Sequence, residues 1–278
     1  TGARLYRDPY ALPLGYLVSP GAEGFSFDEL GDPFARQNAF ASALVGRPVE
    51  LFRPCEAAEE EAPDGTRTWR AQVPEGAIGY AYVEASRRAG ECELSVDGGA
   101  PVTENARFQQ SIHALTGVTE ASAEVTVALA FTNEGEGLAG DAGEAAFAQD
   151  AATCLIYWLD LAALEEIVGE LGARPLEVTA FSGAGIAGAV DGGAEGGLLM
   201  VTVPNDPGWE ARVDGQRVET VDIAGGALTG IPVGPGESQV AMTYRTPGLA
   251  AGCAVSIVAL AGAVALAVRG RRGSAVGA

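Results

Sequence analysis

The sequence predicts a mainly β protein: β-sandwich domains of jelly-roll-like type with two short helices, followed by one transmembrane α-helix at the C-terminus. Three observations predict it. Short apolar runs recur every roughly 8–12 residues between turns rich in Gly and Asp. Two segments begin with helix-capping residues. A long charge-free run precedes three arginines near the end of the chain. With 278 residues, the chain can form two domains with hydrophobic cores.

The predicted strands share an alternation of apolar and polar residues, which is typical of a sheet with one buried face. Two Asp-Gly pairs, at residues 97–98 and 214–215, each join short alternating stretches and predict tight hairpins. The predicted strands are residues 77–83, 92–96, 108–115, 123–131, 183–190, 197–203, 209–213 and 238–244.

Two helices interrupt the strands. Asp32 followed by Pro33 is an N-cap with a first-turn proline, which predicts a helix that ends near Gly46. Asp160 caps a second helix, residues 161–171. In this second helix the apolar stripe Leu161, Leu164, Val168 and Leu171 should face a sheet, and Glu165, Glu166 and Glu170 should lie in solvent.

The segment 133–147 is rich in Gly and acidic residues and lacks periodicity, so we expect it to be a linker. It divides a first β-rich domain, residues 1–132, from a second β-sandwich domain, residues 148–247.

Residues 249–268, from Leu249 to Val268, form a run of 20 residues without a charge. At ~1.5 Å per residue this helix would span roughly 30 Å, the thickness of the hydrocarbon core of a bilayer. The arginines at 269, 271 and 272 follow at once and indicate that residues 269–278 form a cytoplasmic tail. The lipid bilayer is therefore an expected partner, with residues 1–248 on the outer, extracytoplasmic side; a buried core helix is the alternative.

The overall charge is −20, from 17 basic and 37 acidic residues, whereas the mean hydropathy is slightly positive at +0.15. The apolar C-terminal run explains this combination, because the acidic residues all precede it. A chain with this net negative charge offers no net positive surface to a phosphate backbone. Nucleic acid is therefore not an expected partner.

Short motifs in a fixed order resemble the YfhO family of bacterial membrane proteins. Near the N-terminus, YALPLGY at residues 10–16 and DPFARQN at 32–38 are similar to the YALP-x-G and NPF-x-x-QN blocks of that family. The second half continues the series with YWLD at 157–160, GLL at 197–199, VPNDPGW at 203–209, DG at 214–215, PGE at 235–237 and YRTPG at 244–248.

This resemblance implies that the chain is the C-terminal extracytoplasmic domain and last transmembrane helix of a polytopic protein. The family looks like a relative of membrane glycosyltransferases that use polyprenyl-phosphate sugars to decorate cell-envelope polymers. The resemblance implies that the catalytic acidic residues lie among early transmembrane helices upstream of this chain. We therefore expect no catalytic residue here, and an accessory or acceptor-binding role. Expected partners are those upstream helices and an envelope glycopolymer.

One carbohydrate-binding site is a candidate. Trp209 begins a predicted strand after Pro207-Gly208, and its ring beside the carboxylates of Asp206 and Asp214 would suit stacking on a sugar. A core aromatic that locks a hairpin is the alternative interpretation of Trp209.

Other chemistry is not indicated. His113 is the one histidine, and it lies in an alternating strand without a nucleophile-elbow motif. The four cysteines and one histidine have no zinc-site spacing, and no EF-hand spacing occurs, so neither a metal nor another cofactor is predicted. On an oxidising exterior, Cys55 and Cys92 are candidates for a disulfide that spacing alone does not establish.

A second functional hypothesis is a single-span surface protein that displays a β-sandwich for binding or structure, without enzymatic activity. Its apolar tail resembles wall-sorting tails, but the LPxTG-type motif is missing before the span.

Overall fold

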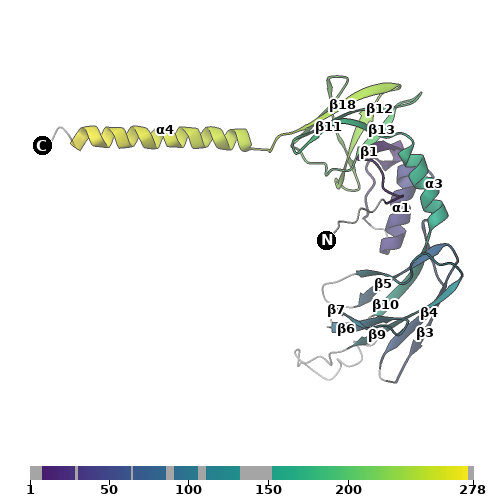
Figure 1. Cartoon of the computed structure of the whole chain (residues 1–278). Helices are drawn as coiled ribbons and strands as arrows, with labels where there is room; N and C mark the ends of the chain where they lie inside the picture. Colours follow the sequence, from purple (N-terminus) through teal and green to yellow (C-terminus); the bar gives the residue numbers. More distant parts are fainter. Residues whose placement is uncertain are drawn as a thin grey trace, which may run out of the picture. The chain divides into compact units, whose positions relative to one another are not determined.

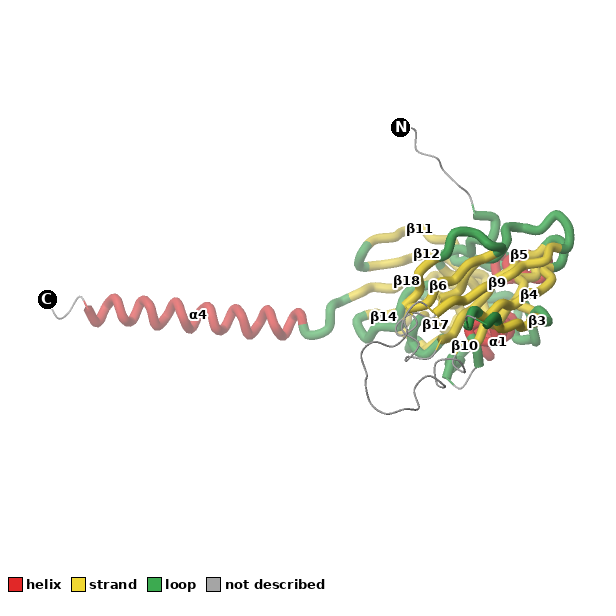
Figure 2. Tube along the Cα trace, turned by 90° about the horizontal axis from the view of Figure 1, so that it is seen from below, coloured by secondary structure: helices red, strands yellow, loops and turns green. Residues whose placement is uncertain are grey.

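The computed structural model describes residues 8–28, 31–63, 65–85, 91–105, 111–131 and 152–274. The chain forms two compact units, Thr1–Leu12 with Phe27–Ala173 and Pro13–Ser26 with Arg174–Ala278. Strands are the main secondary structure of both units (Figure 2), and the described strands pair in antiparallel sheets. We call their strand regions the first and the second sandwich.

The first sandwich consists of two antiparallel sheets (Figure 1). The five-stranded sheet has the order β3 (Ala57–Glu61), β4 (Arg67–Val73), β9 (Ala123–Phe131), β6 (Glu91–Val96), β7 (Val102–Asn105). The four-stranded sheet has the order β2 (Phe52–Pro54), β10 (Ala152–Asp160), β5 (Ala77–Ala85), β8 (Ser111–Ala114).

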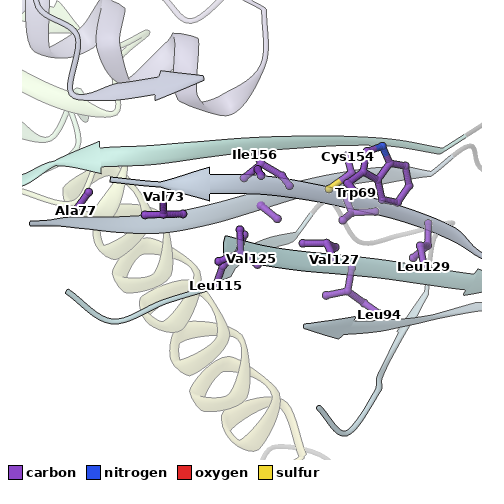
Figure 3. Packing of buried hydrophobic residues seen from close by; sticks show 13 residues of the cluster. Trp69, Val73, Ala77, Leu94, Leu115, Val125, Val127, Leu129, Cys154 and Ile156 are labelled. Atoms are coloured by element: carbon purple, nitrogen blue, oxygen red, sulfur yellow. The ribbon is translucent and has the colours of Figure 1, made fainter. Parts of the chain in front are cut away.

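One hydrophobic core lies between these sheets (Figure 3). Trp69 and Val127 come from the five-stranded sheet, whereas Ala81, Cys154 and Ile156 come from the four-stranded sheet. These side chains alternate with exposed residues along the strand. In β4, for example, Trp69, Ala71 and Val73 are buried, and the residues between them are exposed. The burial pattern confirms the sandwich that the sequence predicts.

Helix α1 (Pro33–Val45) begins at the predicted cap: the Asp32 carboxylate accepts hydrogen bonds from the backbone N–H groups of Phe34 and Ala35, at 2.9 and 3.0 Å. It ends at Gly46, whose φ of 72° is in the left-handed region that Gly adopts readily. The Phe34 ring stacks on Tyr157 of β10, with 4.4 Å between ring centroids. This contact attaches the helix to the four-stranded sheet.

Helix α3 (Leu161–Gly172) is capped by Asp160, which accepts from the Ala163 N–H at 3.1 Å. Ile167 and Leu171 are its buried residues, and the predicted stripe residues Leu161, Leu164 and Val168 are half-buried. The three glutamates predicted to face solvent are exposed, and two of them, Glu166 and Glu170, each accept from Arg47 at 2.8 Å.

The second sandwich also consists of two sheets. The four-stranded sheet has the order β1 (Gly15–Val18), β13 (Gly197–Val201), β17 (Leu228–Val233), β16 (Val221–Ile223). The five-stranded sheet has the order β11 (Glu177–Ser182), β12 (Gly185–Asp191), β18 (Glu237–Tyr244), β14 (Trp209–Val213), β15 (Gln216–Val218). A short 3-10 helix, η1 (Pro20–Ala22), follows β1, and a second core joins the sheets through side chains such as Leu199, Ile231 and Met242.

The two five-stranded sheets share one topology. In each, a hairpin forms either edge, and the last strand in the chain, β9 or β18, lies between the two hairpins; the second hairpin turns at an Asp-Gly pair. Asp97 and Asp214 both have positive φ, 49° and 52°. Each carboxylate accepts from a backbone N–H of the neighbouring strand, Thr126 at 2.8 Å and Gln239 at 2.9 Å. This repeated Asp clamp shows that the sandwiches use the same device at equivalent hairpins.

Most predicted strands are confirmed, and residues 123–131 and 209–213 agree to the residue with β9 and β14. The predicted strand 108–115 is described from residue 111 on, as β8. The predicted linker 133–147 lies outside the described residues. The two units divide at Ala173 and Arg174, not at this linker, because β10 pairs with β5 along its whole length.

Helix α4 (Leu249–Ser274) follows the second sandwich. Its residues 249–266 are long and apolar enough to cross a membrane, and none of them is buried by the rest of the chain. A core helix of a soluble protein would be covered by its own domain, so the exposure of α4 agrees with the predicted transmembrane helix.

Candidate functional site

Trp209 is the first residue of β14 and pairs with Tyr244, the last residue of β18. Their rings lie edge to face, with 5.0 Å between centroids and an interplanar angle of 61°. Trp209 is half-buried and packs against the core of the second sandwich. Part of the indole thus stabilises the sandwich, and the remainder is exposed to solvent.

The turn before Trp209 is fixed by backbone contacts. The Asp206 carboxylate accepts from the Gly208 N–H at 2.7 Å, and the Asp206 carbonyl accepts from the Trp209 N–H at 3.0 Å. The Gly208 carbonyl accepts from the Arg245 N–H at 2.9 Å. A Cβ at Gly208 would lie 2.5 Å from Cε2 of Tyr244. Only glycine therefore allows the strands to approach this closely.

Asp206 also interacts with the hydroxyl of Tyr244. Partial desolvation raises the pKa of Tyr244, and the hydrogen bond to Asp206 and its negative charge raise it further. The Tyr244 hydroxyl therefore donates a hydrogen bond to the Asp206 carboxylate and stays neutral. Asp206, Gly208, Trp209 and Tyr244 form one cluster, which we call the Trp209 corner.

Asp214 does not belong to the Trp209 corner. It follows the other end of β14, and five residues of extended strand separate the two ends by roughly 16 Å. Its carboxylate accepts from the Gln239 N–H, and its own N–H donates to the Gln239 carbonyl at 2.8 Å. The structure thus brings Trp209 and Asp206 together and gives Asp214 a different place and set of contacts.

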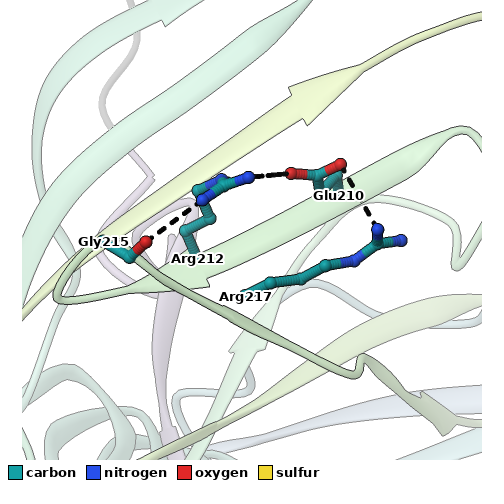
Figure 4. A network of polar contacts seen from close by, with 4 residues as sticks. All are labelled: Glu210, Arg212, Gly215 and Arg217. Atoms are coloured by element: carbon teal, nitrogen blue, oxygen red, sulfur yellow. Dashed lines mark hydrogen bonds and ion pairs between the residues drawn. The ribbon is translucent and has the colours of Figure 1, made fainter.

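A polar network that the sequence analysis did not predict lies along β14 and β15 (Figure 4). Nε and Nη2 of Arg212 donate to Oε1 of Glu210 at 3.0 and 2.7 Å, and Nη1 donates to the Gly215 carbonyl at 3.1 Å. Nη1 of Arg217 lies 3.7 Å from Oε2 of Glu210. Glu210 therefore bridges two arginines on adjacent strands.

The electrostatics of Glu210 follow from these contacts. The hydrogen bond from Arg212 lowers the pKa of Glu210, and the charges of Arg212, Arg217 and Arg245 lower it further. The alternation of Glu210 and Arg212 in the sequence places both on one face of a strand. Arg217 joins them only through the register of the hairpin, in which it pairs with Arg212.

The cysteines differ in environment. Burial, and less strongly the charge of Glu59, raise the pKa of the Cys154 thiol to about 12. Burial also raises the pKa of Cys55, which is half-buried and a free thiol in the structure. The side chain of Cys92 lies outside those described, so the Cys55–Cys92 disulfide stays a prediction. Within the described ranges, no three His, Cys, Asp or Glu side chains are grouped to hold a metal ion.

Comparisons with known proteins give one family. Residues 148–256 match the family model of "Bacterial membrane protein YfhO". This range includes β10, α3 and every strand of the second sandwich except β1, and it ends inside α4. The comparison with curated proteins gave no match.

Solved structures show weak likeness. A GH2 beta-galacturonidase from Eisenbergiella tayi is 11% identical, with a TM-score of 0.25, over 71% of this chain and 38% of that protein. Procruciferin, an 11S globulin from Brassica napus, is 10% identical, with a TM-score of 0.14, over 69% of this chain and 77% of the globulin. A cupin 2 conserved barrel domain protein from Leptotrichia buccalis is 10% identical, with a TM-score of 0.14, over 69% of this chain and 91% of that protein.

Proposed function

We propose that the chain is the C-terminal outer part of a polytopic member of the YfhO family of bacterial membrane proteins, whose family model matches residues 148–256. In this proposal the two sandwiches lie outside the cell membrane and α4 is the last transmembrane helix. They serve a glycosyltransferase-like protein as an accessory part that holds an envelope polymer near the membrane.

The observation that carries this proposal is the continuity of the family match from a sandwich into an apolar helix. The match includes every strand of the second sandwich except β1 and reaches residue 256, inside α4. A domain with its own core that leads directly into an exposed apolar helix is the architecture of an outer domain tied to a bilayer.

Charge supports the proposed orientation. The three arginines at 269, 271 and 272 follow the span, and the segment after residue 248 has no acidic residue. Arginines that flank a span favour the cytoplasmic side, which supports an outer location for residues 1–248.

The Trp209 corner is the proposed contact for a sugar of the acceptor polymer. It combines a partly open indole face with the Asp206 carboxylate, which can accept hydrogen bonds from sugar hydroxyls. Trp209→Phe keeps the aromatic packing against Tyr244 and reduces the stacking surface. We expect this variant of the complete protein to bind envelope glycopolymer several-fold more weakly while its sandwich stays folded. Unchanged binding would show that the Trp209 corner does not contact the polymer.

A deletion tests the accessory role. In the complete protein, removal of residues 1–248 should leave the upstream helices in the membrane at normal levels and abolish glycosylation of the polymer. A truncated protein that glycosylates normally would contradict the proposal. The single-span surface protein remains the second candidate, which a reading frame with a signal peptide directly before Thr1 and no further spans would favour.

A further inference from the structure

The end of the second sandwich where β18 stops at Tyr244 differs in composition from the opposite end. We call the first the proximal end, because the chain continues from it into α4. The turn between β11 and β12 lies at this end: Ser182 pairs with Gly185, and the Ala184 carbonyl accepts from the Tyr244 N–H at 2.9 Å. Figure 2 shows β11, β12 and β18 side by side, in agreement with their pairing.

Three further loops reach the proximal end, and residues 22–26 lie beside one of them, because the Gly225 N–H donates to the Phe25 carbonyl at 3.2 Å. The loop 202–208 leads from β13 into Trp209, and the Asn205 N–H donates to the Gly226 carbonyl at 3.0 Å, which joins it to loop 224–227. Residues 245–248 connect to α4, and the Arg245 N–H donates to the Gly208 carbonyl. These contacts place segments 182–185, 202–208, 224–227 and 245–248 at one end of the sandwich.

The proximal loops are nearly free of charge. Their sequences, SGAG, TVPNDPG, AGGA and RTPG, contain one acidic residue, Asp206, and one basic residue, Arg245. The Asp206 carboxylate is engaged with Gly208 and Tyr244. Asp222 of the adjacent β16 accepts from the Asn205 amide at 2.6 Å. The exposed Glu23 of segment 22–26 adds one further carboxylate beside this end.

The opposite, distal end is acidic. Its loops at 191–196, 214–215 and 234–237 have the sequences DGGAEG, DG and GPGE, with acidic residues and no basic residue. Backbone hydrogen bonds of 2.8 Å from Gly192 to Gly236 and from Gly236 to Gly193 join two of these loops. The distal loops are therefore more acidic than the proximal loops, although the Arg212 guanidinium donates to the Gly215 carbonyl of one distal loop.

An exposed aromatic ring adds to this asymmetry. Phe181 of the edge strand β11 lies one residue before the proximal turn and is 68% exposed. Val178, at the other end of the same strand, is 40% exposed and lies further from the turn. A large apolar side chain next to small uncharged turn residues is typical of loops that contact the headgroup region of a bilayer.

The chain keeps this end near the start of α4. At no more than about 3.6 Å per residue, the five steps from Tyr244 to Leu249 span at most about 18 Å. We propose that the proximal end of the second sandwich rests on the bilayer surface, with Phe181 and the β11–β12 turn in contact with the lipid headgroups. Acidic side chains would be repelled by anionic lipid, which agrees with their position at the distal end.

This inference rests on α4 as a membrane span, as proposed above, but on no role in glycosylation. The test uses the full chain in nanodiscs of phosphatidylcholine and phosphatidylglycerol, with native cysteines replaced by alanine. A fluorophore is attached to Gly183→Cys at the proximal end or to Gly234→Cys at the distal end. Both glycines have nothing within 4 Å of an added Cβ, so the two variants are matched.

Nitroxide on the lipid headgroups should quench the label at 183 at least about threefold more than the label at 234, because nitroxide quenching requires close approach. Phe181→Ser should reduce the quenching at 183, whereas Val178→Ser should not. Equal, weak quenching at both positions would overturn the inference.

A third label separates the two proposals. In a variant that retains only Cys253, within α4, nitroxide on the acyl chains should quench the label. Quenching at Cys253 without quenching at 183 would overturn the surface contact and leave the span intact. No quenching at Cys253 would overturn both, because α4 would not be inserted.

Discussion

The Asp clamp of the second sandwich leads to a prediction about three substitutions of one residue. Asp214 holds the β14–β15 hairpin in two ways: its backbone adopts a positive φ of 52°, and its carboxylate accepts from the Gln239 N–H at 2.9 Å. Asn keeps both properties, Gly keeps only the backbone conformation, and Ala keeps neither. The series Asp214→Asn, Asp214→Gly and Asp214→Ala therefore separates the two contributions.

The magnitudes follow from these contacts. An Ala residue in the left-handed region costs about 1 kcal/mol. Loss of the hydrogen bond to the exposed carboxylate costs about 0.5–1 kcal/mol, at the low end because solvent can replace it. The free energy of unfolding of the second sandwich should thus fall by about 1.5–2 kcal/mol in Asp214→Ala and by about 0.5–1 kcal/mol in Asp214→Gly. In Asp214→Asn it should change by less than about 0.5 kcal/mol.

Hydrogen exchange of peptides from β18, measured by mass spectrometry on the full chain in detergent micelles, gives the opening free energy of this sandwich. The same series at Asp97, measured on peptides from β9, should give the same order, because the clamp to Thr126 is equivalent. The reasoning would be refuted if Asp214→Asn destabilised the sandwich as much as Asp214→Ala does. It would also be refuted if Asp214→Gly destabilised it more than Asp214→Ala does.

Three further predictions concern local packing, capping and thiol chemistry. Gly208→Ala should destabilise the second sandwich by roughly 1–3 kcal/mol, since its Cβ would lie 2.5 Å from the Tyr244 ring, whereas Gly234→Ala should be neutral in the same exchange assay. Similar effects of both would contradict the steric argument. Asp32→Ala should lower the stability of the first sandwich by about 1 kcal/mol in urea unfolding, and Asp32→Asn should restore it, because only a side-chain acceptor is needed to cap α1. At pH 9, well below its pKa of about 12, Cys154 in the folded chain should react with iodoacetamide at least ~100-fold more slowly than in urea; equal rates would show that the thiol is exposed and ionised.

Local signals in the sequence predict much of the fold. The cap at Asp32 and the glycine at 46 define α1 to the residue, because both act within one helical turn. The Asp-Gly pairs predict hairpins because the turn needs residues that accept positive φ. The apolar run at 249 predicts α4 from length and composition alone.

Long-range pairing explains what the sequence analysis missed. Residues 152–160 belong to the first sandwich because β10 pairs with β5, about seventy residues earlier in the chain, and no local pattern encodes that partner. The edge strand β3, with the sequence AAEEE, is exposed along its whole length and has no apolar alternation to reveal it. The shared topology of the two five-stranded sheets is likewise visible only in the strand order.

The candidate site could likewise be predicted from the sequence only where its contacts are local. Asp206 and Trp209 meet because a turn of four residues joins them, and adjacency in the sequence predicts that. Asp214 follows an extended strand, so a short separation in the sequence becomes a long one in space. The bridge from Glu210 to Arg217 depends on hairpin register, which the sequence analysis did not derive.

The sidedness of the chain tests the central claim most directly, because the proposed function and the bilayer contact both require the sandwiches and the tail to lie on opposite sides of the membrane. In cells that produce the complete protein without its native cysteines, one variant has Gly234→Cys and another has a cysteine added after Ala278. A membrane-impermeant maleimide should label position 234 in intact cells and the added C-terminal cysteine only after permeabilisation. The reverse pattern, or labelling of both in intact cells, would contradict the account.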